Sequence, residues 1–574
     1  MMLSRAEKTA LIFVACIAAG LLYAGWELFW FLTDDAFISY RYVSNSVLGH
    51  GYVWNPPPFQ PVEGYTNFLW VVLLDFVWRL LGVVPPEAAN NISLVFSFGS
   101  VIIAAAFTLR IPWHRGLVGF RIPCVALVLL GTIGNRSFLA WTSSGLETAM
   151  FNFLILAWLY FVLTRPFNAT WVFVTTLSSS LLALTRPDGV LFVAASLISI
   201  AIGLHRCPGP KRLHFPWTAL PAVLVPVHLI WRRTFYGDWL PNTYYAKITG
   251  IWPGSGIRYA GSFILEYALW IWILLAIFAL VWRFPILRGA FLCDPVGTRV
   301  PRALEAREDA RSRSHHRALV RCIGILTVVA HLGYYTLVVG GDHFEYRVYS
   351  YLVPLIFISF AWLTNVAQLH TRSAVTLLVC FVLFSFPLPW THWYLSHERT
   401  TRRDTVEMFV PVAPSFPPGL STYARSFDSL QAWLIQHFVC MRHQEHKIAY
   451  EWWSETVIPT REVGQKLRLP DGDFPILVLP GGAGSTAWVL PHINIIDLHG
   501  LNDRVIGRVP RDPERPRRMA HSRVAPPGYI EAFAPNTRIL AGKKIVVEKR
   551  ERAIVADDIR EIERIWLERT KRAG

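Results

Sequence analysis

Long apolar stretches are the feature of this sequence that most constrains its fold. Residues 8–32 and 319–339 contain almost no charged side chains, and a helix needs about 20 such residues to cross the hydrocarbon core of a bilayer. Only 16% of the 574 residues are charged, whereas a soluble domain has about a quarter. We therefore expect a polytopic α-helical membrane protein. This excludes a cytosolic enzyme, a disordered chain and a disulfide-stapled secreted domain.

The net charge of +16 has two interpretations. Basic patches bind nucleic acids, but much of this charge lies in short loops between apolar stretches, where the positive-inside rule places lysine and arginine. We therefore expect the lipid bilayer as a partner and do not expect a nucleic acid. The seven cysteines form no CxxC pair, so neither a zinc site nor a disulfide framework is predicted.

The stretch 67–84 decides the expected membrane topology, that is, which segments span the bilayer and on which side each loop lies. It carries Asp75 and Arg79 four residues apart, the spacing of an ion pair on one helix face, so it is expected to lie on the membrane surface. With this stretch left outside, the N-terminus and the basic loops all fall on the cytoplasmic side. About eleven spans are then expected: the first apolar stretch and residues near 91–109, 120–139, 147–164, 170–185, 189–204, 216–233, 259–283, 319–339, 347–367 and 373–394.

Two regions follow from this topology. Residues 1–395 are expected to form the transmembrane domain, with 33–90 as its first outer loop, and residues 396–574 an extracytoplasmic α/β domain. The elements expected in this domain are short strands near 475–480 and 493–498 and, over 546–572, a strand followed by a solvated helix.

Asp34 and Asp35, at the outer end of the first span, are the sharpest local signal. Adjacent carboxylates at a membrane interface are costly unless they are solvated, paired or functional. Apolar residues at helical spacing follow them and predict a helix lying in the membrane surface. Acidic residues in a first helical turn, capped by Thr33, explain the pair equally well. One carboxylate can cap the helix while the other reacts.

Three segments of the first outer loop carry a family resemblance. DDAFISYRY (34–42), GHGYVWN (49–55) and VEGYTNFLW (62–70) together resemble a family of GT-C-fold membrane glycosyltransferases. That family includes the mycobacterial terminal arabinofuranosyltransferase and a branch labelled flagellar motor control protein ZomB. Shorter matches are GLET (145–148), RPDG (186–189), YGDWLPN (236–242), GGDHF (340–344) and DLHGLND (497–503); Ala520 before His521 departs from the family's Gly-His pair.

The resemblance implies an enzyme that moves a sugar, arabinofuranose among the candidates, from a polyprenyl-phosphate donor to a cell-envelope glycan or glycolipid. It also implies the outer face of a bacterial inner membrane, a periplasmic C-terminal domain and an essential aspartate in the first outer loop. No cofactor is expected. Asp238 and Asp342 have the charge to hold a divalent cation, but no spacing demands one.

Glycosyl transfer from a phosphate needs an ionised general base and cations or donors for the leaving group. Asp34 or Asp35 is the expected base, with Asp35 preferred. The candidate donor-phosphate and substrate residues are Arg41, His50, Glu63, Tyr65, Asn67, Glu147, Arg186, Asp188, Asn242, Asp342, His343 and Arg347, with Lys247 as a further cation; those of the C-terminal domain are Asp497, Asn502, Asp503 and His521.

Two other functions compete with the enzyme. A transporter of lipid-linked sugar usually shows repeats and polar helices at mid-membrane, whereas the motifs here gather on one face. A non-enzymatic protein that affects the flagellar motor or envelope assembly would tolerate amides at Asp34 and Asp35. We therefore prefer the hypothesis that the protein is an enzyme.

Overall fold

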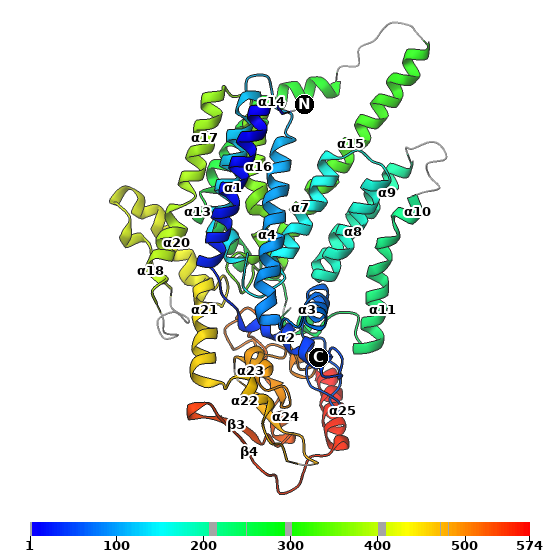
Figure 1. The fold of residues 1–574 in the computed structure, drawn as a ribbon, viewed down its shortest axis with the longest axis vertical. Helices are drawn as coiled ribbons and strands as arrows, with labels where there is room; N and C mark the ends of the chain where they lie inside the picture. Colours follow the sequence, from blue (N-terminus) through cyan, green and yellow to red (C-terminus); the bar gives the residue numbers. More distant parts are fainter. Residues whose placement is uncertain are drawn as a thin grey trace.

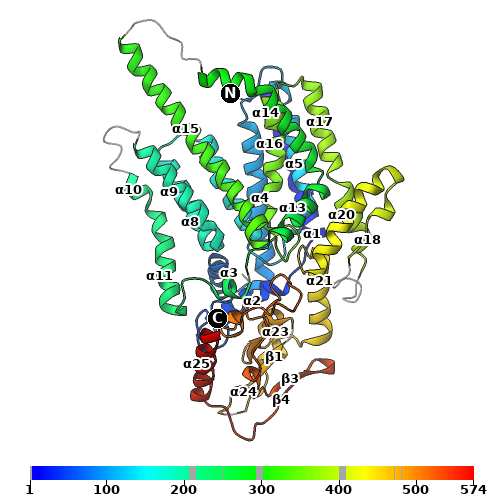
Figure 2. The same cartoon turned by 180° about the vertical axis from the view of Figure 1, so that it is seen from behind.

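The computed structural model describes residues 3–205, 215–247, 250–292, 301–399, 409–470, 472–479 and 481–573. Its helices form a long bundle, and the C-terminal part of the chain lies beyond one end of that bundle (Figure 1). The N-terminus lies at the opposite end. The same arrangement is seen from behind in Figure 2.

Within the described ranges, six helical segments are long and apolar enough to cross a membrane: Arg5–Leu28, Pro85–Leu109, Pro187–His205, Arg317–Val339, Arg347–Val366 and Thr371–Ser396. Large apolar side chains on them face outward, among them Ile12, Phe13 and Ile102, each about two-thirds exposed. A soluble monomer rarely exposes continuous apolar surface of this kind. The chain is therefore a polytopic helical membrane protein.

The bundle helices are α1 (Arg5–Leu28), α4 (Pro85–Leu109), α5 (Arg121–Ile133), α6 (Arg136–Ala140), α7 (Thr148–Thr164), α8 (Ala169–Thr185), α9 (Val190–His205), α10 (Phe215–Thr218), α11 (Leu224–Tyr236), α12 (Asn242–Lys247), α13 (Pro253–Glu266), α14 (Leu269–Leu292), α15 (Pro301–Gly333), α16 (Leu352–Val366), α17 (Thr371–Phe384) and α18 (Pro387–Ser396). Small residues bring several of them close together: a Cβ on Gly99 of α4 would lie 2.6 Å from Phe153 of α7.

Two of the predicted spans differ from the structure. The stretch 259–283 is not one helix, because α13 and α14 meet at a 90° bend, where Ala268 adopts a positive φ of 50°. The stretch 216–233 contains α11, whose 13 residues cover only about 20 Å at 1.5 Å per residue. Three more predicted spans correspond to apolar helices shorter than 18 residues, namely α5 with the turn before it, α7 and α8.

Two short helices, α2 (Asp34–Val47) and α3 (Phe68–Leu81), lie between the bundle and the C-terminal part (Figure 1). Arg79 Nε of α3 lies 2.9 Å from Asp75 Oδ1, which confirms the ion pair predicted from their spacing. Tyr52 and Ser46 donate to the other oxygen of Asp75. The helix ends at Gly82, whose φ of 69° is in the left-handed region that favours glycine.

The C-terminal part contains the predicted strands. β1 (Ile476–Leu479) and β2 (Asn494–Asp497) pair in parallel, with Ile476 opposite Asn494, and the buried helix α23 (Ala483–Val489) connects them. β3 (Thr537–Leu540) and β4 (Lys544–Val547) form a hairpin. The remaining helices are α20 (Pro418–Gln436), α21 (His443–Trp452), α22 (Arg461–Gln465), α24 (Tyr529–Ala532) and α25 (Ala556–Ala573).

The chain does not enter this separate part directly after residue 396. The helix α20 returns to the bundle and packs against α13, where Gln431 donates to Ser262. The helix α21 then runs from the bundle to the C-terminal part (Figure 2). The two regions are consequently joined through α21 and through the packing of α2 against α23.

Candidate active site

The two adjacent carboxylates of α2 have different surroundings. Asp34 accepts hydrogen bonds from the backbone N–H groups of Gly484 (3.2 Å) and Ser485 (2.8 Å) and from Ser485 Oγ (2.6 Å). Burial raises the pKa of Asp34, and these hydrogen bonds oppose the shift. The side chain thus binds the N-terminal turn of α23, where backbone N–H groups lack partners in their own helix. Asp34 therefore links α2 to the C-terminal part through hydrogen bonds to α23.

The carboxylate of Asp35 is partly exposed, as Asp34 is, but it has neither a hydrogen bond nor an ion pair with any residue that the structure describes. Its negative charge acts on the imidazoles of His343 and His521, whose ring centres are 5.0 Å apart. Asp35 therefore lies within electrostatic range of these two rings, and its oxygens have no hydrogen-bond partner among the described residues.

Both imidazoles are held in one tautomer. Burial lowers the pKa of His343 to about 4 and the pKa of His521 well below its usual value, so both rings are neutral at pH 7. Each Nδ1 lies 2.8 Å from a backbone carbonyl, of Phe438 for His343 and of Met519 for His521. Because Nδ1 carries the proton in that arrangement, Nε2 of each ring is an acceptor.

Three of the sequence motifs meet at Glu147. Its carboxylate accepts hydrogen bonds from Arg186 Nη1 (2.9 Å) and from Asn67 Nδ2 (2.8 Å). Arg186 also lies 3.3 Å from Asp188, and its Nη2 donates to Tyr335. The first outer loop and the GLET and RPDG segments are thus joined at one point.

The GGDHF segment contributes further charge to the same region. Arg347 Nε lies 2.7 Å from Asp342 Oδ2. Burial alone would raise the pKa of Asp342, but the positive charges of Arg347, Arg186 and Lys247 hold it below its usual value. Of these three cations Arg347 pairs directly with Asp342, and His343 is the next residue along the chain.

The structure gives Arg41 a different surrounding from the predicted phosphate site. The side chain is fully buried, and it donates to the backbone carbonyls of Trp54, Ala487, Leu490 and Ile493, each at 3.0 Å. A phosphate would have to displace these carbonyls. Arg41 instead joins α2 to α23 and to the start of β2. His50 is exposed beyond the end of α2 that is remote from Asp35.

Other predicted site residues hold the first outer loop in place. Glu63 forms a buried ion pair with Arg232 at 2.6 Å, and the hydroxyls of Tyr65 and Tyr236 are 3.1 Å apart. Asn242 Nδ2 donates to backbone carbonyls of the DLHGLND segment at 2.8 to 3.1 Å. These groups already have protein partners, so they position the site rather than face a ligand.

The DLHGLND segment is itself organised by its own carboxylates. Asp497 accepts from the backbone N–H and the side-chain amide of Asn502, whose Oδ1 accepts from Tyr42. Asp503 accepts from Tyr529 and from the backbone of residues 505 and 506. Burial raises the pKa of Asp503 to about 6. His499 of this segment packs against His521, with ring centres 4.5 Å apart.

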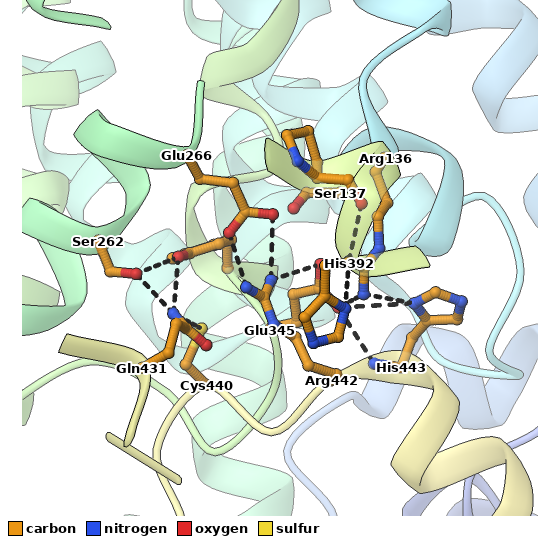
Figure 3. Close-up of polar contacts among 12 residues, drawn as sticks. Arg136, Ser137, Ser262, Glu266, Glu345, His392, Gln431, Cys440, Arg442 and His443 are labelled. Carbon is orange, nitrogen blue, oxygen red and sulfur yellow. Dashed lines mark hydrogen bonds and ion pairs between the residues drawn. The ribbon is translucent and has the colours of Figure 1, made fainter. Parts of the chain in front are cut away.

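A buried ionic network beside the site was not expected from the sequence (Figure 3). Glu345 lies 3.0 Å from both Arg136 and Arg442, and Arg442 lies 2.9 Å from Glu266. All four side chains are at most 1% exposed. Glu345 also accepts from the backbone N–H of His443 at 3.1 Å. The network fixes the loop that carries Asp342 and His343 against the start of α21.

Nothing in the described ranges forms a group of three or more histidine, cysteine, aspartate or glutamate side chains able to hold a metal ion. The divalent cation that the charges of Asp238 and Asp342 would allow therefore has no such ligand group among the described residues. The chemistry available here is that of one free carboxylate, neutral imidazoles and arginine and lysine cations.

No protein-family model matches the chain, and no curated protein matches it. One solved structure with a similar arrangement is that of ArnT from Cupriavidus metallidurans, described as bound to undecaprenyl phosphate. The two are 13% identical, the match covers 84% of each chain, and the TM-score is 0.46. At this level of similarity the activity has to be inferred from the residues of the chain itself.

Proposed function

We propose that the protein is a membrane glycosyltransferase that moves a sugar from a polyprenyl-phosphate donor to a hydroxyl of a cell-envelope glycan or glycolipid. The observation that carries this proposal is the carboxylate of Asp35, which has no hydrogen bond to a described residue and acts electrostatically on the neutral imidazoles of His343 and His521. The residue before His343, Asp342, pairs with the Arg347 cation. A general base and an anion-binding group at the end of an apolar bundle suit a lipid-linked phosphate donor.

In the proposed reaction the acceptor oxygen forms a bond to the anomeric carbon of the sugar. The bond between that carbon and the phosphate oxygen breaks, and its electron pair leaves with the polyprenyl phosphate. The acceptor proton passes to Asp35. The transition state resembles an oxocarbenium ion. Arg186 and Arg347 stabilise the negative charge on the phosphate, which requires no protonation to leave.

The groups around the two carboxylates favour Asp35 over Asp34 as the base. Asp34 is occupied by three donors from α23 and positions the helix that carries Asp35. The Nε2 atoms of His343 and His521 accept hydrogen bonds, which suits an acceptor hydroxyl approaching Asp35. We place this face, with the C-terminal part, on the periplasmic side of the inner membrane. Arabinofuranose is the first sugar to test, because of the family resemblance of the first outer loop.

Sugar transfer by the purified full-length protein in proteoliposomes tests the proposal. The donor is radiolabelled polyprenyl-phosphoryl arabinofuranose, and the acceptor is an arabinose-bearing glycan; hexose carriers are tried next. We expect labelled product, and we expect Arg347→Gln to raise the KM for the donor. Arg372→Gln, which removes one cation from the opposite end of the bundle, is the matched control. No transfer from any of these carriers would overturn the proposal.

A further inference from the structure

A second polar site lies at the end of the bundle remote from α2. A cavity of about 150 Å³ lies between α7, α8 and α15, lined by Arg165, Arg317 and Arg321 and by apolar side chains that include Trp171. The other end of α7 is near α2, where Tyr40 donates to Gly145. The 17 residues of α7 separate the two sites by about 25 Å. The cavity is therefore distinct from the proposed active site.

The three arginines are placed to receive an anion. Arg321 Nε donates to the carbonyl of Leu163 at 3.0 Å, which fixes its guanidinium at the cavity. Arg165 donates to the hydroxyl of Tyr160 and lies over that ring at 5.2 Å. Arg317 precedes Arg321 by one helical turn, so both face the same side of α15.

No carboxylate is among the described residues that line this cavity, and like charges four residues apart on a helix are mutually destabilising. An anion between the guanidinium groups would remove that repulsion. A liquid water molecule occupies about 30 Å³, so the cavity has room for a tetrahedral phosphate group. Arginine forms paired hydrogen bonds with such oxyanions.

The remaining walls favour a lipid phosphate over a free one. Val162, Phe167 and Val320 make the cavity apolar on its other sides. Next to it on the same helices, Ile325 and Leu326 of α15 and Phe173 of α8 are 44–63% exposed. This apolar surface faces the hydrocarbon region of the membrane, where acyl chains continue from a headgroup bound in the cavity. Basic pockets between transmembrane helices bind anionic lipid headgroups in this way.

We propose that the cavity between α7, α8 and α15 binds the phosphate of an anionic phospholipid from the leaflet at that end of the bundle. The guanidinium groups of Arg165, Arg317 and Arg321 hold the phosphate oxygens, and the acyl chains lie along α8 and α15. This site is independent of sugar transfer, so it stands whether or not the proposed reaction is found.

Native mass spectrometry of the full-length protein with phosphatidylglycerol or phosphatidylcholine tests the proposal. The test variant is R165Q/R317Q/R321Q. The matched control, R110Q/R115Q/R372Q, removes the same charge near the same end of the bundle from arginines that are exposed like the test residues but do not line the cavity. Wild type and control are expected to prefer phosphatidylglycerol, and the test variant is expected to lose about a hundred-fold in that preference, as three near-surface cations imply.

A second variant separates lost binding from lost folding. R165Q/R317Q keeps the hydrogen bond from Arg321 to Leu163; we expect it to melt at the wild-type temperature and to lose most of the preference. Equal phosphatidylglycerol binding by the wild type and the test variant would overturn the proposal. A separate experiment adds inorganic phosphate alone to the protein in lipid-free micelles and measures whether the protein is stabilised. If inorganic phosphate stabilises the wild type and does not stabilise R165Q/R317Q/R321Q, the cavity is a free-phosphate site. That result would overturn the lipid assignment.

Discussion

The substitution Asp34→Asn tests how α2 is attached to the C-terminal part. The carboxylate accepts three hydrogen bonds from Gly484 and Ser485, and an amide offers one acceptor oxygen and turns an NH₂ group toward backbone donors. Hydrogen bonds to charged groups contribute about 1.5–3 kcal/mol each. The equivalent of one such bond is lost, so local opening of α23 should become about 10- to 150-fold more frequent.

Hydrogen–deuterium exchange of the amides in residues 481–490 measures this opening. Asp35→Asn is the matched control, because the same change is made one residue away on a carboxylate without a hydrogen bond to the described residues. We expect faster exchange in Asp34→Asn and wild-type exchange in Asp35→Asn. Unchanged exchange in Asp34→Asn, or the same increase in both variants, would refute the distinction between the two carboxylates.

Three further predictions follow from the structure. Glu345→Gln leaves a buried positive charge uncompensated and should destabilise the protein by about 3–5 kcal/mol, seen as a lower melting temperature in detergent. Burial lowers the pKa of His443 to about 4 from 6.5, so the unfolded chain binds more protons than the folded protein between these pH values. The melting temperature should therefore fall as the pH drops from 6.5 toward 4. A melting temperature that does not change over this range would contradict the prediction. Gly484→Ala places a Cβ 2.1 Å from the carbonyl oxygen of Asp34 and should loosen α23 in the exchange experiment, whereas Gly481→Ala, whose Cβ would meet nothing within 4 Å, should not.

Local patterns in the sequence were sufficient for the elements that depend on neighbouring residues. The ion pair of Asp75 and Arg79 follows from a spacing of four on one helix. The strands β1 and β2 follow from short apolar runs. The broken helix at Ala268 was missed because no proline or glycine marks the bend, which tertiary packing imposes on residues that otherwise favour a continuous apolar helix.

The candidate site was less accessible to sequence reasoning. The residue types that bind a phosphate also bind carbonyl oxygens, so Arg41 is chemically suited to both, and only the positions of residues 487–493 decide between them. The ionic network of Glu345 joins partners 97 and 209 residues away. No local signal relates such residues. The adjacent carboxylates on α2 were visible in the sequence, but their different surroundings depend on α23, some 450 residues further along the chain.

The most direct test of the proposed function is the rate of sugar transfer by the Asp35→Asn variant relative to the wild type and to Asp34→Asn, under saturating donor and acceptor. General-base catalysis contributes about 10²- to 10⁴-fold. We predict a loss of that size in Asp35→Asn, with α23 exchanging as in the wild type. Transfer by Asp35→Asn at the wild-type rate would contradict the assignment of Asp35 as the base.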